Sequence, residues 1–200
     1  GMKFVLNLLN CSSEHYQNSS LKAECKEIEL IFSEEEKVKQ ICSERLWQMH
    51  RNSDSNPDVL ECVLMALEKW LLEGAKRFPE KLVNKFCLFL LKNSNNVAIT
   101  ATVLSVVEAY PEKLFGISCI LIRTKEICYY DTCRGAAEIR AGLMSGFLPR
   151  DKVFEEERVT SNNFEFRKIT FEQVIMDYQI KRGDLSREEF ERRISTLYSI

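Results

Sequence analysis

The stretch of residues 96–110, NVAITATVLSVVEAY, is apolar on almost every side when it is drawn as a helix. A helix that is apolar all round must be buried on most of its sides, so the rest of the chain is expected to pack around it. Asn95 or Asn96 can cap its first turn, and Pro111 ends it because proline inside a helix loses a hydrogen bond. The β-branched residues leave a buried strand as the alternative. About fourteen residues between cap and proline are too many for a usual strand, so a helix is favoured.

The composition fits one substantial core with a surface that carries both signs of charge. Of the 200 residues, 45% are hydrophobic and 29% are charged, which is enough to bury a core and to keep the protein dissolved. The 28 basic and 30 acidic residues give a net charge of −2. No whole-molecule field therefore attracts nucleic acid or an anionic membrane, and neither is expected as a partner.

The location of the protein is inferred from its apolar runs and its cysteines. No uncharged run reaches the roughly twenty residues that a bilayer needs, and the start of the chain lacks a secretory signal pattern. The eight cysteines lie mostly within apolar helical patterns, and the chain is large enough to fold without disulfides. We therefore expect reduced thiols and a cytoplasmic protein.

After a first predicted helix that begins at Lys3–Leu9, apolar spacing predicts two more helices between residue 21 and about residue 51. Residues 21–32 carry Leu21, Cys25 and Ile28 at helical spacing, which predicts one amphipathic helix. Ser33 and Glu36 then match a capping box, in which each side chain binds the other residue's free backbone N–H. This pattern predicts a further helix that runs from there to about residue 51.

The most specific internal signal is a repeated motif. The sequence FPEKL, which begins at Phe78, recurs 32 residues later as YPEKL, which begins at Tyr110. The same offset places Cys87 over Cys119 and aligns apolar positions on both sides. A period of this length with two helices per unit is typical of α-solenoids, although two proline-started helices can also match by coincidence. The sequence thus predicts an all-α fold, an α-α superhelix of HEAT/ARM-like helical hairpin repeats.

Helix starts and breaks define the predicted domain organisation. Pro57 opens a strong helix that Gly74 is expected to end, and the stretch Lys125–Met144 is predicted to be a helical pair with a break at Gly135. The repeat domain is expected to span residues 1–148. A C-terminal helical extension, residues 149–200, is expected to pack on it, with a capping box of Thr170 and Gln173 opening one of its helices.

The sequence offers few candidates for chemistry. Cys11 and His15 are spaced to share a helix face, but zinc takes four ligands and no second pair has ligand spacing. His15 and His50 are interpreted as surface histidines, and the acidic run 34–36 as the start of a helix. No phosphate-binding or metalloprotease motif occurs. We therefore predict no catalytic residue, no cofactor and no metal site.

One cluster is a candidate for binding a partner. Tyr129, Tyr130, Asp131 and Arg134 combine two aromatic rings with an acid and an arginine three positions apart. This spacing allows an ion pair within a helix, and tyrosine and arginine are favoured anchors at protein interfaces. The alternative is that the pair only holds one helical unit against the next.

The runs ALEKWLLE (66–73), LLKNSNNVAITATVLSVVEAYPEKL (90–114) and YYDTCR (129–134) carry a family resemblance. They resemble the helical region downstream of the nucleotide-binding module in large bacterial STAND-type NTPases, including those of antiphage defence, and FEQVIMDYQ (171–179) is weakly similar to the same proteins. The resemblance implies a non-catalytic α-solenoid that senses a ligand, couples sensing to oligomerisation, or packs against the NTPase. This chain lacks every nucleotide-binding motif, so the resemblance does not extend to ATPase activity.

Two functional hypotheses follow. The first is an interaction or sensor scaffold without enzyme activity, either free-standing or part of a longer parent chain, whose partner is a protein. The second is a small helical enzyme with a cryptic site near Cys119, Cys128, Asp131 and Arg134. The sequence names neither the partner, the sensed ligand nor the oligomeric state.

Overall fold

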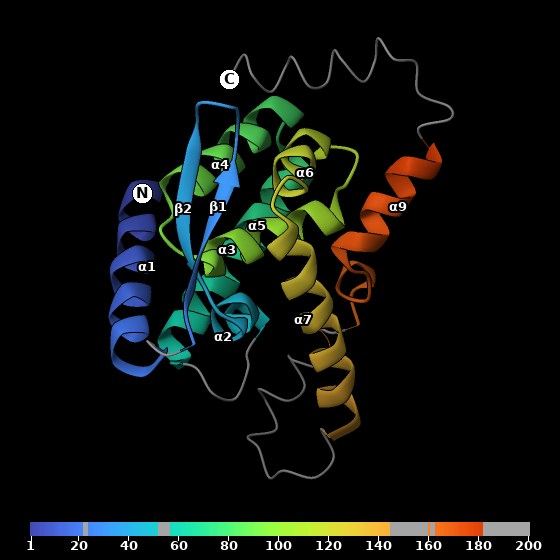
Figure 1. The fold of residues 1–200 in the computed structure, drawn as a ribbon. Helices are drawn as coiled ribbons and strands as arrows, with labels where there is room; N and C mark the ends of the chain where they lie inside the picture. The colour runs from blue at the N-terminus through green and yellow to red at the C-terminus, as the bar shows by residue number, and fades with distance from the viewer. Residues whose placement is uncertain (22–23, 52–56, 145–159, 161–162, 182–200) are drawn as a thin grey trace.

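The computed structural model describes residues 1–21, 24–51, 57–144, 160 and 163–181, and this part of the chain is mostly helical (Figure 1). The α-helices are α1 (Met2–Tyr16), α2 (Glu44–Gln48), α3 (Asp58–Arg77), α4 (Glu80–Asn93), α5 (Val97–Ala109), α6 (Phe115–Leu121), α7 (Lys125–Met144) and α9 (Phe171–Lys181). Shorter helical turns are η1 (Gln17–Leu21), η2 (Met49–Arg51) and η3 (Glu165–Arg167). Strands β1 (Lys26–Ile31) and β2 (Lys37–Cys42) form one antiparallel sheet. Within these ranges, every helix is too short or too polar to cross a lipid bilayer.

Helix α5 is the centre of the fold, as its sequence predicts. The side chain of Asn96 caps it by accepting a hydrogen bond from the backbone N–H of Ala98 at 3.1 Å. Each residue from Val97 to Glu108 is buried. The helix contacts α2, α3, α4 and α6 as well as η3 and α9. The predicted helix is therefore confirmed, and the alternative of a buried strand is wrong.

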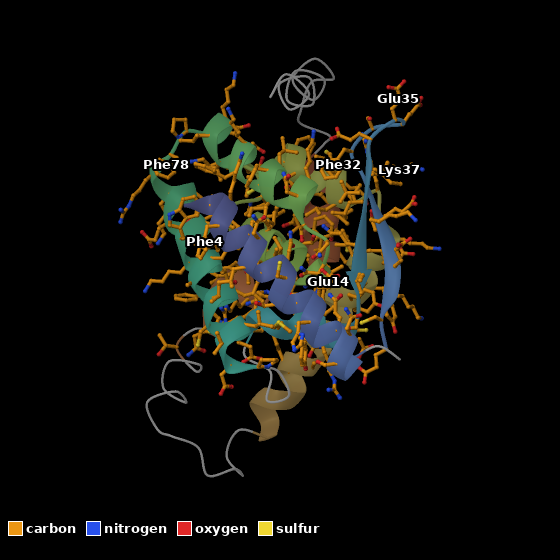
Figure 2. The ribbon with its side chains drawn as sticks, turned by 90° about the vertical axis from the view of Figure 1, so that its left-hand side faces the viewer. Phe4, Glu14, Phe32, Glu35, Lys37 and Phe78 are labelled. Carbon is orange, nitrogen blue, oxygen red and sulfur yellow. The ribbon has the colours of Figure 1, made fainter. Side chains whose placement is uncertain are left out.

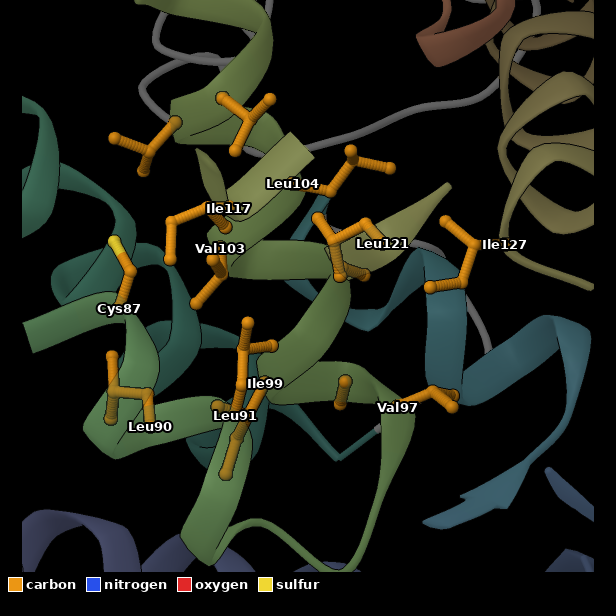
Figure 3. Packing of buried hydrophobic residues seen from close by; sticks show 14 of the residues in the cluster. Cys87, Leu90, Leu91, Val97, Ile99, Val103, Leu104, Ile117, Leu121 and Ile127 are labelled. Carbon is orange, nitrogen blue, oxygen red and sulfur yellow. The ribbon is translucent and has the colours of Figure 1, made fainter. Parts of the chain in front are cut away.

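The core around α5 is built from residues of several helices (Figure 3). Ile99 and Val103 of α5 lie among Leu91 of α4, Ile117 of α6 and other fully buried side chains. Removing one such side chain from water contributes about 1.5–3 kcal/mol to stability. The surrounding helices therefore pack against α5 because its surface is apolar on all sides.

The predicted helix at 21–32 is wrong, because this segment enters a β-hairpin. In β1 and the turn after it, Ile28, Leu30 and Phe32 are buried, and they alternate with the exposed Glu29 and the half-buried Ile31. The register pairs Lys26 with Cys42 and Ile31 with Lys37. Alternation with period two is a strand pattern, and here it outweighs the helical spacing.

The predicted helix start at Ser33 is also wrong, although half of its hydrogen bonding is present. The backbone N–H of Glu36 donates to Ser33 Oγ at 3.0 Å, but this bond closes the turn between β1 and β2. The acidic run 34–36 lies in that turn, where Figure 2 shows Glu35 at the tip. The segment after it is β2, followed by the short helix α2 and the turn η2.

Two predicted helix breaks at glycine are wrong. Helix α3 continues past Gly74 to Arg77, and α7 runs without interruption through Gly135. A Cβ atom added at Gly135 would lie 3.2 Å from Cγ2 of Thr170, closer than most packed carbon atoms. This glycine therefore lets the segment before α9 approach α7, rather than ending the helix.

The repeated motif gives two unequal helical hairpins. Pro79 precedes the 14-residue helix α4, whereas Pro111 is followed by a turn and the seven-residue helix α6. The partner helices α3 and α5 have 20 and 13 residues. Helix α3 packs on α5, and α4 packs on α6. The helical class is confirmed, and a superhelical repeat stays a prediction.

Within the range of the predicted C-terminal extension, η3 and α9 pack on the helices before them. The backbone N–H of Thr170 donates to Gln173 Oε1 at 2.8 Å, which is one of the two bonds of the predicted capping box. Phe171 is fully buried, and the hydroxyl group of Tyr178 donates to the carbonyl of Pro111 at 2.6 Å. The predicted domain boundary near residue 148 lies outside the described residues.

Candidate functional site

The four residues predicted to bind a partner all lie on α7, but on two different faces. Tyr129 is 60% exposed, whereas Tyr130 is 8% exposed and both Asp131 and Arg134 are 1% exposed. Successive residues of a helix are rotated by about 100°, so the direction of Tyr129 differs from those of Asp131 and Arg134 by well over a right angle. The structure thus keeps Tyr129 at the surface and turns the other three residues inward.

The guanidinium group of Arg134 is the centre of a buried ionic cluster. Its Nε donates to Asp131 Oδ1 at 2.7 Å, so the ion pair predicted from the spacing is confirmed. Its Nη1 donates to Glu138 Oε2 at 2.8 Å, and its Nη2 donates to Glu108 Oε1 at 3.1 Å. Nη2 also lies 3.0 Å from the carbonyl oxygen of Ile169. Arg134 therefore connects α7 to α5 and to the segment before α9.

Asp131 extends the same cluster to the start of α9. Its Oδ2 accepts a hydrogen bond from the backbone N–H of Phe171 at 2.8 Å, in addition to its contacts with Arg134. The first N–H groups of a helix have no partner inside the helix, and a carboxylate there is favoured by the helix dipole. One acid on α7 thus both pairs with an arginine and fixes where α9 begins.

A second arginine reaches the cluster from η2. Arg51 Nη2 lies 3.5 Å from Glu108 Oε2, and Arg51 Nε lies 3.5 Å from Glu138 Oε1. Arg51 Nε also donates to Nε2 of His50 at 3.0 Å. Because Nε2 accepts this bond, the proton of the neutral ring is on Nδ1, which donates to the carbonyl of Trp47 at 3.1 Å.

The interpretation of His50 as a surface histidine is wrong. The side chain is buried, and burial together with the charges of Arg51, Arg167 and Arg134 holds the pKa of the ring well below its usual value. A neutral imidazole is therefore an acceptor for Arg51 inside the cluster. The local sequence does not indicate this burial, because only Arg51 is adjacent to His50, whereas Arg134 and Arg167 come from distant parts of the chain.

Glu108 is the residue of this cluster that sequence reasoning overlooked. It is the single charged residue in the apolar stretch 96–110, and a carboxylate on an otherwise buried helix needs buried cations as partners. Burial and the neighbouring Asp131 raise the pKa of Glu108 well above its usual value, while Arg134 and Arg51 oppose the shift. The isolated acid in an apolar stretch was the available signal.

A neighbouring ionic group ties the C-terminal segment to α3. Glu68 of α3 accepts a hydrogen bond from the hydroxyl group of Ser105 on α5, and its other oxygen accepts from Arg167 Nη2 at 2.7 Å. All three side chains are buried. Charges without water as a partner are tolerated only when they are paired in this way. The ionic cluster around Arg134 and the group around Glu68 therefore both connect the central helix α5 to elements packed on it.

The four residues of the enzyme hypothesis, Cys119, Cys128, Asp131 and Arg134, are not arranged as reactive groups. Burial raises the pKa of the Cys119 thiol to about 11. The pKa of Cys128 is also raised, first by burial and then by Asp131 and Glu172. A cysteine nucleophile requires the thiolate form, which these shifts disfavour near neutral pH. Asp131 and Arg134 are occupied with each other and with their structural partners.

Cys11 and His15 both lie exposed on α1. Among the residues that the structure describes, no group of three or more histidine, cysteine or acidic side chains is arranged to hold a metal ion. All eight cysteines are free thiols.

No protein-family model matches the sequence, and no curated protein matches it. The resemblance to the helical region of STAND-type NTPases stays a prediction.

Proposed function

We propose that this protein is a non-catalytic helical scaffold that binds a protein partner, or the remainder of a longer parent chain, through the outward face of α7. The observation that carries the proposal is the division of α7 into two faces. One face holds the buried ionic cluster around Arg134, and the other exposes an aromatic ring and an aliphatic side chain.

The outward face consists of Tyr129, Thr132, Cys133, Ala136 and Ile139. Tyr129 is 60% exposed and Ile139 is 72% exposed. At about 100° per residue, these five positions fall within roughly one third of the helix circumference, opposite Asp131 and Arg134. Large apolar and aromatic side chains gain the most free energy when a partner covers them.

The buried face explains why α7 suits such a role. Three acidic side chains and a backbone carbonyl hold the guanidinium group of Arg134. A helix fixed in this way loses little conformational entropy when it binds, which favours affinity. The outward face is thus presented on a rigid support.

The helical architecture supports the wider scaffold hypothesis. We interpret α3–α4 and α5–α6 as two units of a short helical repeat, since α3 packs on α5 and α4 packs on α6. The resemblance to STAND-type NTPases suggests that the parent assembly is a bacterial sensor of that kind. We also propose a cytoplasmic location, which the eight free thiols support.

The proposal is tested by site-specific photo-crosslinking in the native host. A photo-reactive amino acid replaces Tyr129 in one variant and the exposed Glu14 of α1 in a control variant. We expect a defined crosslinked protein from position 129 and not from position 14. The captured protein is then purified, and its affinity for the wild-type chain and for Tyr129→Ala is measured.

The expected result is at least a tenfold loss of affinity in Tyr129→Ala, which corresponds to about 1.4 kcal/mol. The variant should keep its melting temperature, because an exposed side chain contributes little to stability. Equal crosslinking from both positions, or unchanged affinity in Tyr129→Ala, would show that the outward face of α7 is not the binding surface.

A further inference from the structure

A second exposed group of apolar side chains lies where α3 and α4 meet. The rings of Trp70 and Phe86 contact edge to face with centroids 5.2 Å apart, and Phe78 lies 6.4 Å from Phe86. Leu82 precedes Phe86 by one helical turn on the same face. We call Trp70, Phe78, Leu82 and Phe86 the aromatic patch. Figure 2 shows Phe78 at the outer edge of the molecule.

The surroundings of the aromatic patch are positively charged, in contrast to the whole chain. Residues 69–86 contain five basic and two acidic side chains, which gives a local charge of +3, whereas the chain carries −2. The acid Glu73 is paired with Lys76 and Arg77. Of the five basic side chains in residues 69–86, Lys69, Lys81 and Lys85 form no ion pair within the described part of the chain.

The shape of the aromatic patch favours a helix as its occupant. Trp70 is 42% exposed and Phe86 is half-buried, so the protein covers more than half of each side chain. A side chain that inserts into a membrane has to project, whereas a partner helix brings its own side chains into the seam between two helices. Because lysines surround the rings, a partner helix that carries acidic side chains would be complementary in charge.

We propose that the aromatic patch binds an amphipathic helix of a partner protein, with its apolar side chains on Trp70 and Phe86 and its acidic side chains against Lys69, Lys81 and Lys85. This surface belongs to α3 and α4, so it is separate from the outward face of α7. The binding of one partner at each surface would make the chain a connector between two proteins.

The test uses two synthetic helical peptides with the same row of leucine and phenylalanine residues. One peptide carries glutamates beside the apolar row, and the other carries lysines at the same positions. The chain has two tryptophans, of which Trp47 is fully buried and Trp70 lies in the aromatic patch. Binding of the glutamate peptide should shift the emission of Trp70 to shorter wavelength, with a Kd below about 0.1 mM at low salt.

Charge exchange makes the test specific. In Lys81→Glu/Lys85→Glu, we expect the glutamate peptide to bind at least ten times more weakly and the lysine peptide to gain binding. The control Lys26→Glu/Lys125→Glu changes the net charge equally at exposed positions outside the aromatic patch and should bind as wild type does. Trp70→Phe should abolish the fluorescence shift, which shows that Trp70 reports the binding.

Three results would overturn the proposal. The first is the absence of binding by the glutamate peptide up to millimolar concentration. The second is equal binding of both peptides, or equal weakening by the two double variants, because charge complementarity would then play no part. The third is that vesicles of anionic lipid bind through Lys81 and Lys85 and displace the glutamate peptide, which would assign the aromatic patch to a membrane surface.

Discussion

Replacement of Arg134 by methionine should cost a large share of the stability of this protein. The substitution keeps an unbranched side chain but removes the bonds to Asp131, Glu138, Glu108 and the carbonyl of Ile169. The carboxyl groups of Glu108 and Asp131 remain buried without their main cation. Loss of one partner from a buried ion pair typically costs about 3–5 kcal/mol. For a chain of this size, that corresponds to a fall in melting temperature of about 6–20 °C.

The assay is urea denaturation followed by far-ultraviolet circular dichroism, with Arg77→Met as the matched control. Arg77 also forms an ion pair one turn away on its helix, with Glu73 at 3.3 Å, but both side chains are exposed to water. Such pairs contribute about 0.3–0.5 kcal/mol. The control should therefore remain close to wild type, and the difference between the two variants isolates the effect of burial.

Two further measurements test the reasoning behind that magnitude. Glu108→Gln combined with Arg134→Met removes the acid that has lost its cation, so the double variant should be less destabilised than the sum of the single variants. Without the guanidinium group, the folded state of Arg134→Met binds protons more readily than that of wild type. Its stability deficit should therefore shrink as the pH falls. An Arg134→Met variant within about 1 kcal/mol of wild type at neutral pH would refute the account of the cluster.

The remaining predictions concern the core, the pH dependence and metal binding. Val103→Asp places a charge in the fully buried centre of α5 and should unfold the protein. The control Val59→Asp, at an exposed site, should not unfold it. A melting temperature of Val103→Asp within about two degrees of wild type would contradict this prediction. The pKa of His50 is lowered in the folded state, so below about pH 6.5 only the unfolded chain takes up this proton. The free energy of unfolding should therefore decrease as the pH decreases, by up to about 1.4 kcal/mol per pH unit. His50→Asn should remove that part of the slope between about pH 5 and 6.5, and an unchanged slope in urea titrations would count against the burial of a neutral ring. The isolated chain should hold no stoichiometric zinc and bind no ATP, and metal analysis that finds one zinc per chain would disprove the first part.

The elements that sequence reasoning found correctly are those with a local cause. Helix α5 is apolar on all sides and ends near a proline, so no distant contact is needed to identify it. The bond from Thr170 to Gln173 lies within four residues and follows from the capping pattern. The Asp131–Arg134 pair similarly follows from a spacing of three residues on one helix.

The β-hairpin was missed because a short apolar segment satisfies two periods at once. Ile28 fits both the helical series from Leu21 and the alternating series with Leu30 and Phe32. The pairing of β1 with β2 decides between the helix and the strand. The residues of β2 lie outside the short segment in which the apolar spacing is read. Ser33 and Glu36 form the same short hydrogen bond in a turn as at a helix start, so this pattern did not separate the two structures.

The ionic cluster was beyond local reasoning for a different physical reason. Arg51, Glu108 and Arg134 come from three separate elements, and their burial results from the packing of all three. The role of Gly135 likewise depends on the approach of Thr170 from a distant segment. The sequence showed that Asp131 and Arg134 face one another, but it did not show that this face of α7 is the buried one.

The division of α7 into a binding face and a structural face is tested most directly by measuring two quantities on the same two variants. The melting temperature and the affinity for the crosslinked partner are determined for Tyr129→Ala and for Arg134→Met. The account predicts that Tyr129→Ala keeps the wild-type melting temperature and loses affinity, whereas Arg134→Met melts at a much lower temperature. A Tyr129→Ala variant that melts several degrees lower, while its folded fraction binds the partner as wild type does, would contradict the account.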